Sequence, residues 1–241
     1  MGYSDSQCGF LMTMGLAKFN KLPKIVAVGQ NYVLHAKEMG AKSIPKDPIL
    51  FLKSPTSVVI PPEPVKVPSG VVAHYEVELG LVISRMGKNI PKIKANDHIE
   101  SFFCGIDVTA RNLQLEAKSS GSPWSVAKGF DTFLPVSEKL PVDKVKDLND
   151  LNLYLKVDGE MKQQDSTKNM IHSVEDLVSY ISSVMTLQPG DLILTGTPSG
   201  VGEIVSGNVV EAGIKEPSGT SDLVTVKVAV EDDTDTTYTH G

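Results

Sequence analysis

Seven prolines lie between Ile44 and Pro68, and they constrain the fold more than any other feature of the 241-residue chain. Proline lacks the backbone N–H that a helix or a central strand needs, so helix is excluded there and edge strands or an ordered loop remain. Three further segments alternate apolar and polar residues at the period of a β-strand: Val71–Ile83, Leu151–Val157 and Leu223–Val230. Strands therefore dominate the predicted secondary structure.

Short buried strands and a few helices complete the expected elements. The apolar runs Lys24–Gly29 and Asp191–Thr195 are predicted to be buried strands. Helices are predicted over Asn31–Gly40, with the asparagine as N-cap and the glycine just past the end, and over Ser173–Val184, with the serine as N-cap. The polar stretch near Lys94–Ser101 is also helix-like. The predicted fold class is mixed α/β, β-dominated.

Length and composition indicate one globular unit with a sizeable core, which we place at residues 24–241 after a loosely ordered segment, residues 1–23. The net charge of −6 argues against nucleic-acid binding, which requires a basic face. No run approaches the ~18 apolar residues needed to cross a bilayer, so no membrane partner is expected. Cys8 and Cys104 are far apart, which favours a reducing, intracellular location over a disulfide framework.

Two glutamates in one strand are the first indication of chemistry. In a strand, Glu76 and Glu78 share one face about 6–7 Å apart, and their like charges repel. If that face is buried, a cation must compensate them, and Mg²⁺ prefers such carboxylate oxygens. Asp107, which interrupts an apolar strand end, is available as a third ligand. The alternative is that both glutamates lie on the solvent-exposed face of a sheet.

His35 and Glu38 are three residues apart on a predicted helix, so they can touch. A carboxylate that orients a histidine makes it a general base. The alternative is a solvent-exposed helix on which both side chains meet water. Gly29 before this helix and the prolines after it suggest a lid over a pocket.

The glycine-rich run Thr195–Gly202 follows a predicted strand, and its backbone amides could cradle a carboxylate. The alternative is a tight loop that needs glycine for its backbone angles. Trp124 is assigned either to the core or to a pocket wall.

Six motifs occur in one order along the chain: VGQNYVLHAKEMG, FLKSPTS, AHYEVELGLVI, GIDVTARNLQ, GSPWSVAKGFDTFLPV and PGDLILTGTPSGVG. Together they resemble the fumarylacetoacetate hydrolase family, in its small single-domain acylpyruvase, oxaloacetate decarboxylase and oxaloacetate tautomerase branch. The resemblance covers about Lys24 to Gly202, with a closing strand to about Val230. It implies a rolled mixed β-sandwich with peripheral helices, and a homodimer.

The resemblance also implies residue roles. The expected metal ligands are Glu76, Glu78 and Asp107, for Mg²⁺ or alternatively Mn²⁺. The expected catalytic residues are His35, Glu38 and Lys128, with a lid segment at about residues 30–62. The expected substrate-binding residues are Gln114, Arg111 and Thr195, although a structural ion pair is an equal alternative for Arg111. Gln30 stands where arginine is frequent in the family, and Ser199 replaces a common lysine or alanine.

The activity implied by the resemblance is enolisation of a small anionic 2,4-dicarbonyl acid through a metal-bound enolate. We expect keto–enol tautomerisation of oxaloacetate, with acylpyruvate hydrolysis and oxaloacetate decarboxylation in the same pocket. One alternative is an isomerase or decarboxylase of dioic acids from aromatic catabolism, and another is a catalytically silent, dimeric metal-binding protein. Eukaryotic relatives are often mitochondrial, but the segment before Lys24 lacks arginine and is a poor transit peptide, so a cytoplasmic location is the alternative.

Overall fold

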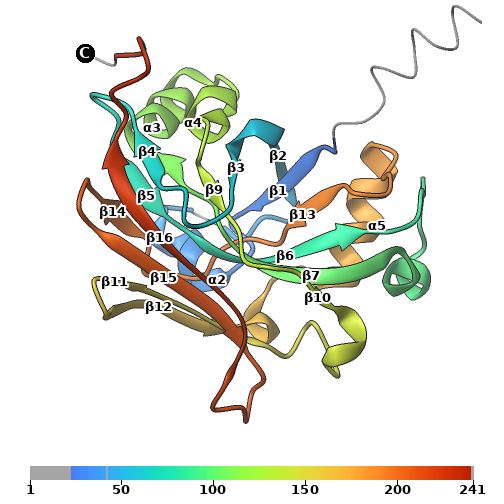
Figure 1. The fold of residues 1–241 in the computed structure, drawn as a ribbon. Coiled ribbons are helices and arrows are strands. Elements are labelled where there is room, and N and C mark those ends of the chain that lie inside the picture. Colours follow the sequence, from blue (N-terminus) through green and yellow to red (C-terminus); the bar gives the residue numbers. More distant parts are fainter. Residues whose placement is uncertain (1–22, 42, 240–241) are drawn as a thin grey trace, which may run out of the picture.

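The computed structural model describes residues 23–41 and 43–239. The segment predicted to be loosely ordered, residues 1–23, lies outside the described residues except for Pro23. Figure 1 shows a strand-rich body with helices at its periphery. The fold class is therefore the predicted one, mixed α/β and β-dominated. In the part of the chain described, no helix is long and apolar enough to cross a membrane.

A six-stranded sheet has the strand order β10-β7-β6-β13-β1-β2. Its strands are β1 (Ile25–Gly29), β2 (Ile49–Lys53), β6 (Val77–Ile83), β7 (Ile99–Ile106), β10 (Leu140–Pro141) and β13 (Leu192–Leu194). The strands β1 and β13 confirm the two buried strands predicted from apolar runs. They pair in parallel, whereas every other pair in this sheet is antiparallel.

A five-stranded sheet has the order β12-β11-β15-β16-β4. Its strands are β4 (Val65–Val67), β11 (Asn152–Val157), β12 (Glu160–Ser166), β15 (Val209–Lys215) and β16 (Asp222–Asp232). The strands β11 and β16 confirm two of the alternating segments. Two small sheets contain β5 (Ala73–Tyr75), β8 (Thr109–Ala110) and β14 (Gly202–Ile204), and β3 (Val58–Val59) with β9 (Leu134–Pro135).

The proline-rich segment forms short strands, as expected. Its strands β2 and β4 are edge strands of the two larger sheets, and β3 lies in the two-stranded sheet. Only a single 3₁₀ turn, Pro55–Ser57, interrupts them. Edge positions suit proline because no ladder hydrogen bond is lost there.

The alternating segment Val71–Ile83 is not one strand, and here the prediction was wrong. The chain leaves the three-stranded sheet after β5 and enters the six-stranded sheet as β6, with Glu76 at the junction. The backbone N–H of Asp107 donates to the Glu76 carbonyl at 2.8 Å, which holds this junction. Every residue of β6 is buried. The strand therefore has no solvent-exposed face, because packing covers both sides.

The α-helices of the described residues are α2 (Val33–Glu38), α3 (Arg111–Ser120), α4 (Ser125–Gly129) and α5 (Val174–Val184). The helix α5 confirms its prediction, with Ser173 and Asp176 forming a capping box. The stretch near Lys94–Ser101 is instead a 3₁₀ helix over Lys92–His98 followed by β7. The remaining 3₁₀ turns are Val142–Lys144 and Thr167–Asn169.

Asn31 is not the N-cap of α2, which corrects a second prediction. The N-cap position is Tyr32, without a side-chain cap. The Asn31 side chain accepts from the His172 N–H at 2.8 Å and donates to the Thr195 carbonyl at 2.8 Å. Asn31 thus anchors the start of α2 through hydrogen bonds to residues that are distant in the sequence.

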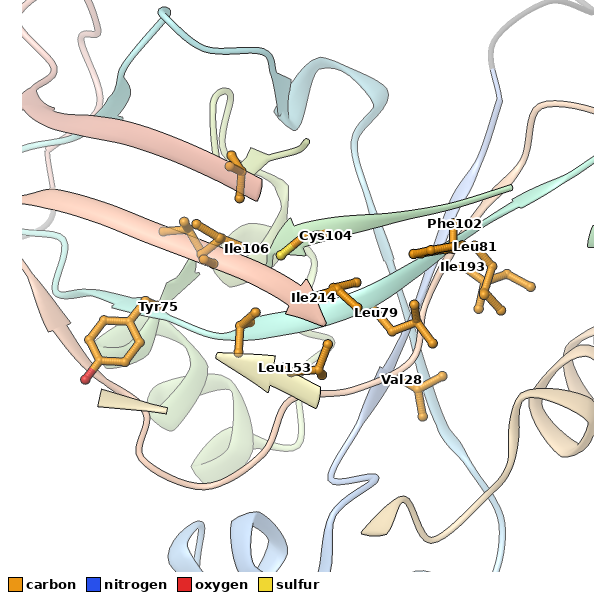
Figure 2. Packing of buried hydrophobic residues seen from close by; sticks show 14 of the residues in the cluster. Val28, Tyr75, Leu79, Leu81, Phe102, Cys104, Ile106, Leu153, Ile193 and Ile214 are labelled. Carbon is orange, nitrogen blue, oxygen red and sulfur yellow. The ribbon is translucent and has the colours of Figure 1, made fainter. Parts of the chain in front are cut away.

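The main core lies against the buried faces of the two larger sheets. Figure 2 shows Leu79 and Leu81 of β6 close to Phe102 and Cys104 of β7, with Leu153 of β11 nearby. These apolar contacts fix the position of β6 and β7. Both strands carry or adjoin the acidic residues of the candidate site, so the core determines the geometry of that site.

Candidate active site

Three carboxylates meet where β6 and β7 pair. Glu78 lies on β6, Glu76 directly precedes β6, and Asp107 directly follows β7. Antiparallel pairing sets Val77 opposite Ile106, so the ends that carry the acids come together. Their ligand oxygens lie within 4.8 Å of one another, and all three side chains are buried. The alternative of a solvent-exposed glutamate pair is therefore wrong.

Three cations surround two of the three carboxylates. Lys128 Nζ lies 2.9 Å from Glu76 Oε2 and 2.6 Å from Asp107 Oδ2. Lys53 Nζ lies 2.9 Å from Asp107 Oδ1, and the Arg111 guanidinium pairs with Glu76 Oε1. Burial opposes ionisation of Glu76, but Lys128 and Arg111 outweigh it and hold its pKa far below the usual range.

Glu78 is in a different electrostatic position. Among the described residues it has no cation in ion-pair contact, and its Oε2 accepts the Gly196 N–H at 2.6 Å. Burial, and then the charges of Asp107 and Glu76, raise its pKa well above the usual range. A divalent cation at the three carboxylates would relieve this, and an all-oxygen donor set suits Mg²⁺ or Mn²⁺. The residues present therefore fit such an ion.

His35 and Glu38 form a hydrogen-bonded pair on α2. The distance from His35 Nδ1 to Glu38 Oε2 is 3.0 Å. The other oxygen of Glu38 accepts the Gly200 N–H at 3.0 Å. His35 is only 4% exposed, so the alternative of a histidine in water is excluded.

Two of the carboxylates, Glu76 and Glu78, and the histidine line one small cavity. The predicted site residues that line it are His35, Glu76, Glu78, Arg111, Gln114 and Lys128. Trp124 also lines it, which decides between the core and the pocket wall for this side chain. Glu38 and Asp107 stand behind lining residues and contact them. Residues of two helices, α2 and α3, thus meet the ends of β6 and β7.

Thr195 is buried but does not belong to the cavity lining, unlike Thr197. The Thr195 hydroxyl donates to the Leu79 carbonyl at 3.1 Å, and its own carbonyl accepts from Asn31. In this structure Thr195 connects β13, β6 and the start of α2.

The glycine-rich loop after β13 both binds carboxylates through its backbone amides and needs glycine for its backbone angles. Its amides at Gly196 and Gly200 bind the carboxylates of Glu78 and Glu38, so they cradle acids of this chain. Both glycines have a left-handed backbone, with φ of 99° and 95°. A Cβ at Gly200 would lie 2.3 Å from the Lys162 carbonyl oxygen, so glycine is also required sterically.

Lys53 and Gln163 belong to the site but were not predicted. Lys53 Nζ donates to the carbonyls of Lys128 (2.7 Å) and Val108 (3.2 Å), in addition to its ion pair with Asp107. The Gln163 amide accepts from Val77 N–H and donates to Thr197 Oγ1, both at 2.9 Å. A lysine at the end of an apolar strand gives a weak signal in the sequence, whereas Gln163 gives none.

Comparison with known proteins identifies the family. The model of the fumarylacetoacetate (FAA) hydrolase C-terminal family matches residues 24–230. The chain is 49% identical over 197 residues to "Oxaloacetate tautomerase FAHD1, mitochondrial" of Arabidopsis thaliana, which covers 81% of this chain and 88% of that protein. It is 48% identical over 193 residues to "Oxaloacetate decarboxylase, mitochondrial" of Dictyostelium discoideum, covering 79% and 88%.

Solved structures agree. Yeast ynq8, a fumarylacetoacetate hydrolase family protein, superimposes with a TM-score of 0.81 at 32% identity, covering 90% of this chain and 96% of that one. Fumarylpyruvate hydrolase from Pseudomonas aeruginosa, in complex with Mn²⁺ and pyruvate, gives 0.79 at 32% identity (88% and 91%). The 2-hydroxyhepta-2,4-diene-1,7-dioate isomerase of Mycobacterium marinum gives 0.75 at 40% identity (88% and 76%).

The fold and the buried carboxylate site define an enzyme with an acidic centre that could hold a metal. The chain belongs to the fumarylacetoacetate hydrolase family, as the sequence motifs had indicated.

Proposed function

We propose that this enzyme is a divalent-metal-dependent oxaloacetate tautomerase, with acylpyruvate hydrolysis and oxaloacetate decarboxylation as further activities of the same pocket. The observation that carries the proposal is that one small cavity is lined by Glu76 and Glu78 of the carboxylate triad and by His35, with Asp107 and Glu38 in contact directly behind its wall. The names of the Arabidopsis and Dictyostelium relatives support this substrate.

Glu76, Glu78 and Asp107 would hold the ion, with Mg²⁺ as the proposed metal and Mn²⁺ as the alternative. A bound divalent ion supplies Lewis-acid polarisation of the substrate's C2 carbonyl. The Mn²⁺ in the fumarylpyruvate hydrolase structure supports a divalent ion in this family.

The charges of the site favour a dianionic substrate. Four carboxylates and four cationic side chains line the cavity or stand directly behind its wall, so they balance when all are ionised. They are Glu38, Glu76, Glu78 and Asp107, and Lys53, Arg111, Lys118 and Lys128. A divalent ion adds two positive charges, which the two carboxylates of oxaloacetate neutralise.

His35 is the proposed base that moves the C3 proton. Glu38 accepts a hydrogen bond from the Nδ1–H of His35, which leaves Nε2 as the basic nitrogen. The same hydrogen bond stabilises the imidazolium that forms when Nε2 takes up a proton. The Gly200 N–H fixes the orientation of Glu38. Arg111 donates to Gln114 Oε1 and thereby orients this amide, whose NH₂ group is left to donate to substrate.

Lys128 is the proposed stabiliser of the negative charge that develops on the C2 oxygen. Its ammonium lies between Glu76 and Asp107, directly at the triad. Charge stabilisation at this point serves all three reactions, since tautomerisation passes through the enolate of oxaloacetate and the two cleavages release the enolate of pyruvate.

The names of the Arabidopsis and Dictyostelium relatives, which specify the four-carbon acid oxaloacetate, favour this proposal over the isomerisation of longer dioic acids. The Mycobacterium marinum relative, named for a seven-carbon dioate, represents that alternative. The intact contacts of His35, Glu38 and Lys128 argue against a catalytically silent protein.

The test is a paired assay of the purified protein with oxaloacetate, with and without Mg²⁺. Enol absorbance and pyruvate release are followed separately. Fast Mg²⁺-dependent decay of the enol with little pyruvate is the expected result, whereas matched pyruvate release would assign decarboxylation. No Mg²⁺-dependent change in either signal would overturn the proposal.

His35→Ala tests the base. The variant should lose turnover by at least about 100-fold while it binds Mg²⁺ nearly as wild type, because His35 contributes no metal ligand. His98→Ala is the matched control, since His98 is a histidine outside the cavity whose ring hydrogen-bonds the Arg85 carbonyl. An unaffected rate in His35→Ala would refute the assignment.

We further propose a homodimer and a mitochondrial location. One side of the six-stranded sheet bears a small apolar cluster next to Ile60, which is 64% exposed, with Val82 and Phe103 beneath it. A second copy of the chain would cover this face, and a molar mass of a dimer in light scattering is the expected result.

The relatives named mitochondrial support the mitochondrial location, which an import assay with the tagged chain tests. The lid motion of residues 30–62 stays a prediction; from Ile49 on, β2 is already part of the sheet.

A further inference from the structure

The helix α3 presents three residues to the cavity at helical spacing. Arg111, Gln114 and Lys118 follow the pattern i, i+3, i+7 and so share one face of the helix. Arg111 contacts Glu76 and therefore marks the end of this face that lies at the carboxylate triad. Lys118 is seven residues further, or about 10 Å along the helix axis. Its backbone therefore lies farther along α3 from the triad than that of Arg111.

The cations next to the triad are already engaged. Lys128 has three N–H donors and three acceptors in contact, namely Glu76 (2.9 Å), Asp107 (2.6 Å) and Thr109 (2.5 Å). Arg111 retains an unpaired Nε, but Glu76 already compensates its charge. Neither side chain is free to bind a second carboxylate far from the triad.

Lys118 differs from both. Across residues 23–41 and 43–239, no carboxylate lies within ion-pair distance of its ammonium group. Its ammonium group lies over the ring of Trp124, whose centroid is 5.3 Å from Nζ. Trp124 is itself held in place by Phe51, with ring centroids 5.5 Å apart. The lysine is thus held at the cavity wall by an aromatic face, which leaves its charge available to an anion.

We propose that Lys118 is a specificity-determining residue that binds the distal carboxylate of a dicarboxylic substrate. This inference rests on the proposed function, since it assigns the two ends of that substrate: the 2-oxo acid end at the triad and the second carboxylate at Lys118. An acylpyruvate without a second carboxylate, such as acetylpyruvate, gains nothing from the lysine. Lys118 thereby sets the preference of the pocket for oxaloacetate over acylpyruvates.

The structure explains why the residue can discriminate without taking part in the chemistry. Burial, and then the charge of Arg111, lower the pKa of Lys118, so the other cations of the site disfavour its protonated form. A bound carboxylate would offset that repulsion. The interaction is made with a part of the substrate that does not react, and therefore affects KM more than kcat.

A binding experiment separates this inference from the proposed catalysis. The probes are malate and 2-hydroxybutyrate, two four-carbon 2-hydroxy acids that differ in whether the distal group is a carboxylate or a methyl. Titration calorimetry on the Mg²⁺-loaded protein measures both, and neither probe is a 2,4-dicarbonyl acid. Wild type should prefer malate by about tenfold, the usual value of one charge-assisted hydrogen bond. Lys118→Met should abolish the preference and Lys118→Arg should keep most of it.

The control is Lys94→Met, which removes a lysine that is 64% exposed and pairs with Asp97 outside the cavity. This variant should keep the wild-type preference. A preference for malate that persists in Lys118→Met would overturn the inference, and so would a wild-type protein that binds neither acid or both equally. If wild type does not turn over oxaloacetate but still prefers malate, the proposed reaction is refuted and the inference about Lys118 stands.

Kinetics provide the second readout. The ratio of kcat/KM for oxaloacetate to that for acetylpyruvate should fall about tenfold in Lys118→Met, through KM for oxaloacetate. A merely structural role of Lys118 would lower both values together and leave the ratio unchanged. Because the lysine is exposed to solvent, the wild-type ratio should also fall with added salt.

Discussion

Replacing Lys53 with methionine should destabilise the protein strongly, because Lys53 compensates a charge in the interior. The side chains of Lys53 and Asp107 are both 0% exposed, and their ion pair spans 2.9 Å. Methionine has a similar length and no charge, so it leaves Asp107 with Lys128 as its only cation in contact. The carbonyls of Lys128 and Val108 lose a donor as well.

The magnitude follows from the burial of the pair. Removing one partner of a buried ion pair costs about 3–5 kcal/mol. For a chain of this size each kcal/mol lowers Tm by about 2–4 °C, so Lys53→Met should melt roughly 6–20 °C below wild type. Saturating Mg²⁺ should reduce the loss, since an ion at Asp107 restores part of the missing positive charge.

The assay is urea and thermal unfolding of both proteins, with and without Mg²⁺. Lys94→Met serves as the matched control, because the side chains of its ion pair with Asp97 are 64% and 53% exposed and such pairs contribute about 0–1 kcal/mol. A loss below about 1 kcal/mol in Lys53→Met, or a loss equal to that of the control, would refute the argument that Lys53 is required to compensate Asp107.

Two further substitutions test the site. Glu78→Gln should weaken Mg²⁺ binding on the order of 100-fold, as measured by calorimetry. The same variant should raise Tm in the absence of metal, because the pKa of Glu78 is raised and its ionised form therefore opposes folding at neutral pH. A lowered Tm without metal would contradict this. Gly196→Ala should cost about 1–3 kcal/mol, since φ is 99° and a Cβ would lie 2.7 Å from Asn31 Cβ. Gly121→Ala is its control, with φ of 71° and nothing within 4 Å of the added atom, and equal losses in both would disprove the steric reason.

Features that depend on neighbouring residues could be predicted from the sequence. The capping box of α5 joins Ser173 to Asp176, and the His35–Glu38 contact joins residues one helical turn apart. Such contacts form in almost any context in which the helix forms. The strands β11 and β16 were likewise evident from their alternation. The six motifs, taken as a resemblance, indicated the family before any coordinate.

Features that depend on distant partners could not be predicted. Asn31 caps no helix because its partners are His172 and Thr195, which lie 141 and 164 positions away. The break of the alternating segment at Glu76 depends on a backbone hydrogen bond from Asp107. Local propensity specifies neither feature. An asparagine side chain can form a local hydrogen bond at a helix start, but in the folded chain its hydrogen bonds go to the distant partners that the tertiary structure places beside it.

The sequence by itself indicated the strand-rich class, the family, the acids, the histidine and one lysine of the site, Lys128. Only the tertiary structure decided which charges compensate one another. Three lysines of the site have the same chemical structure but different surroundings. Lys53 is buried beside Asp107, Lys128 lies between two carboxylates, and Lys118 lies against Trp124 without a carboxylate in contact. The physical reason is that burial and the distance to other charges set the behaviour of an ionisable group, and folding alone fixes both.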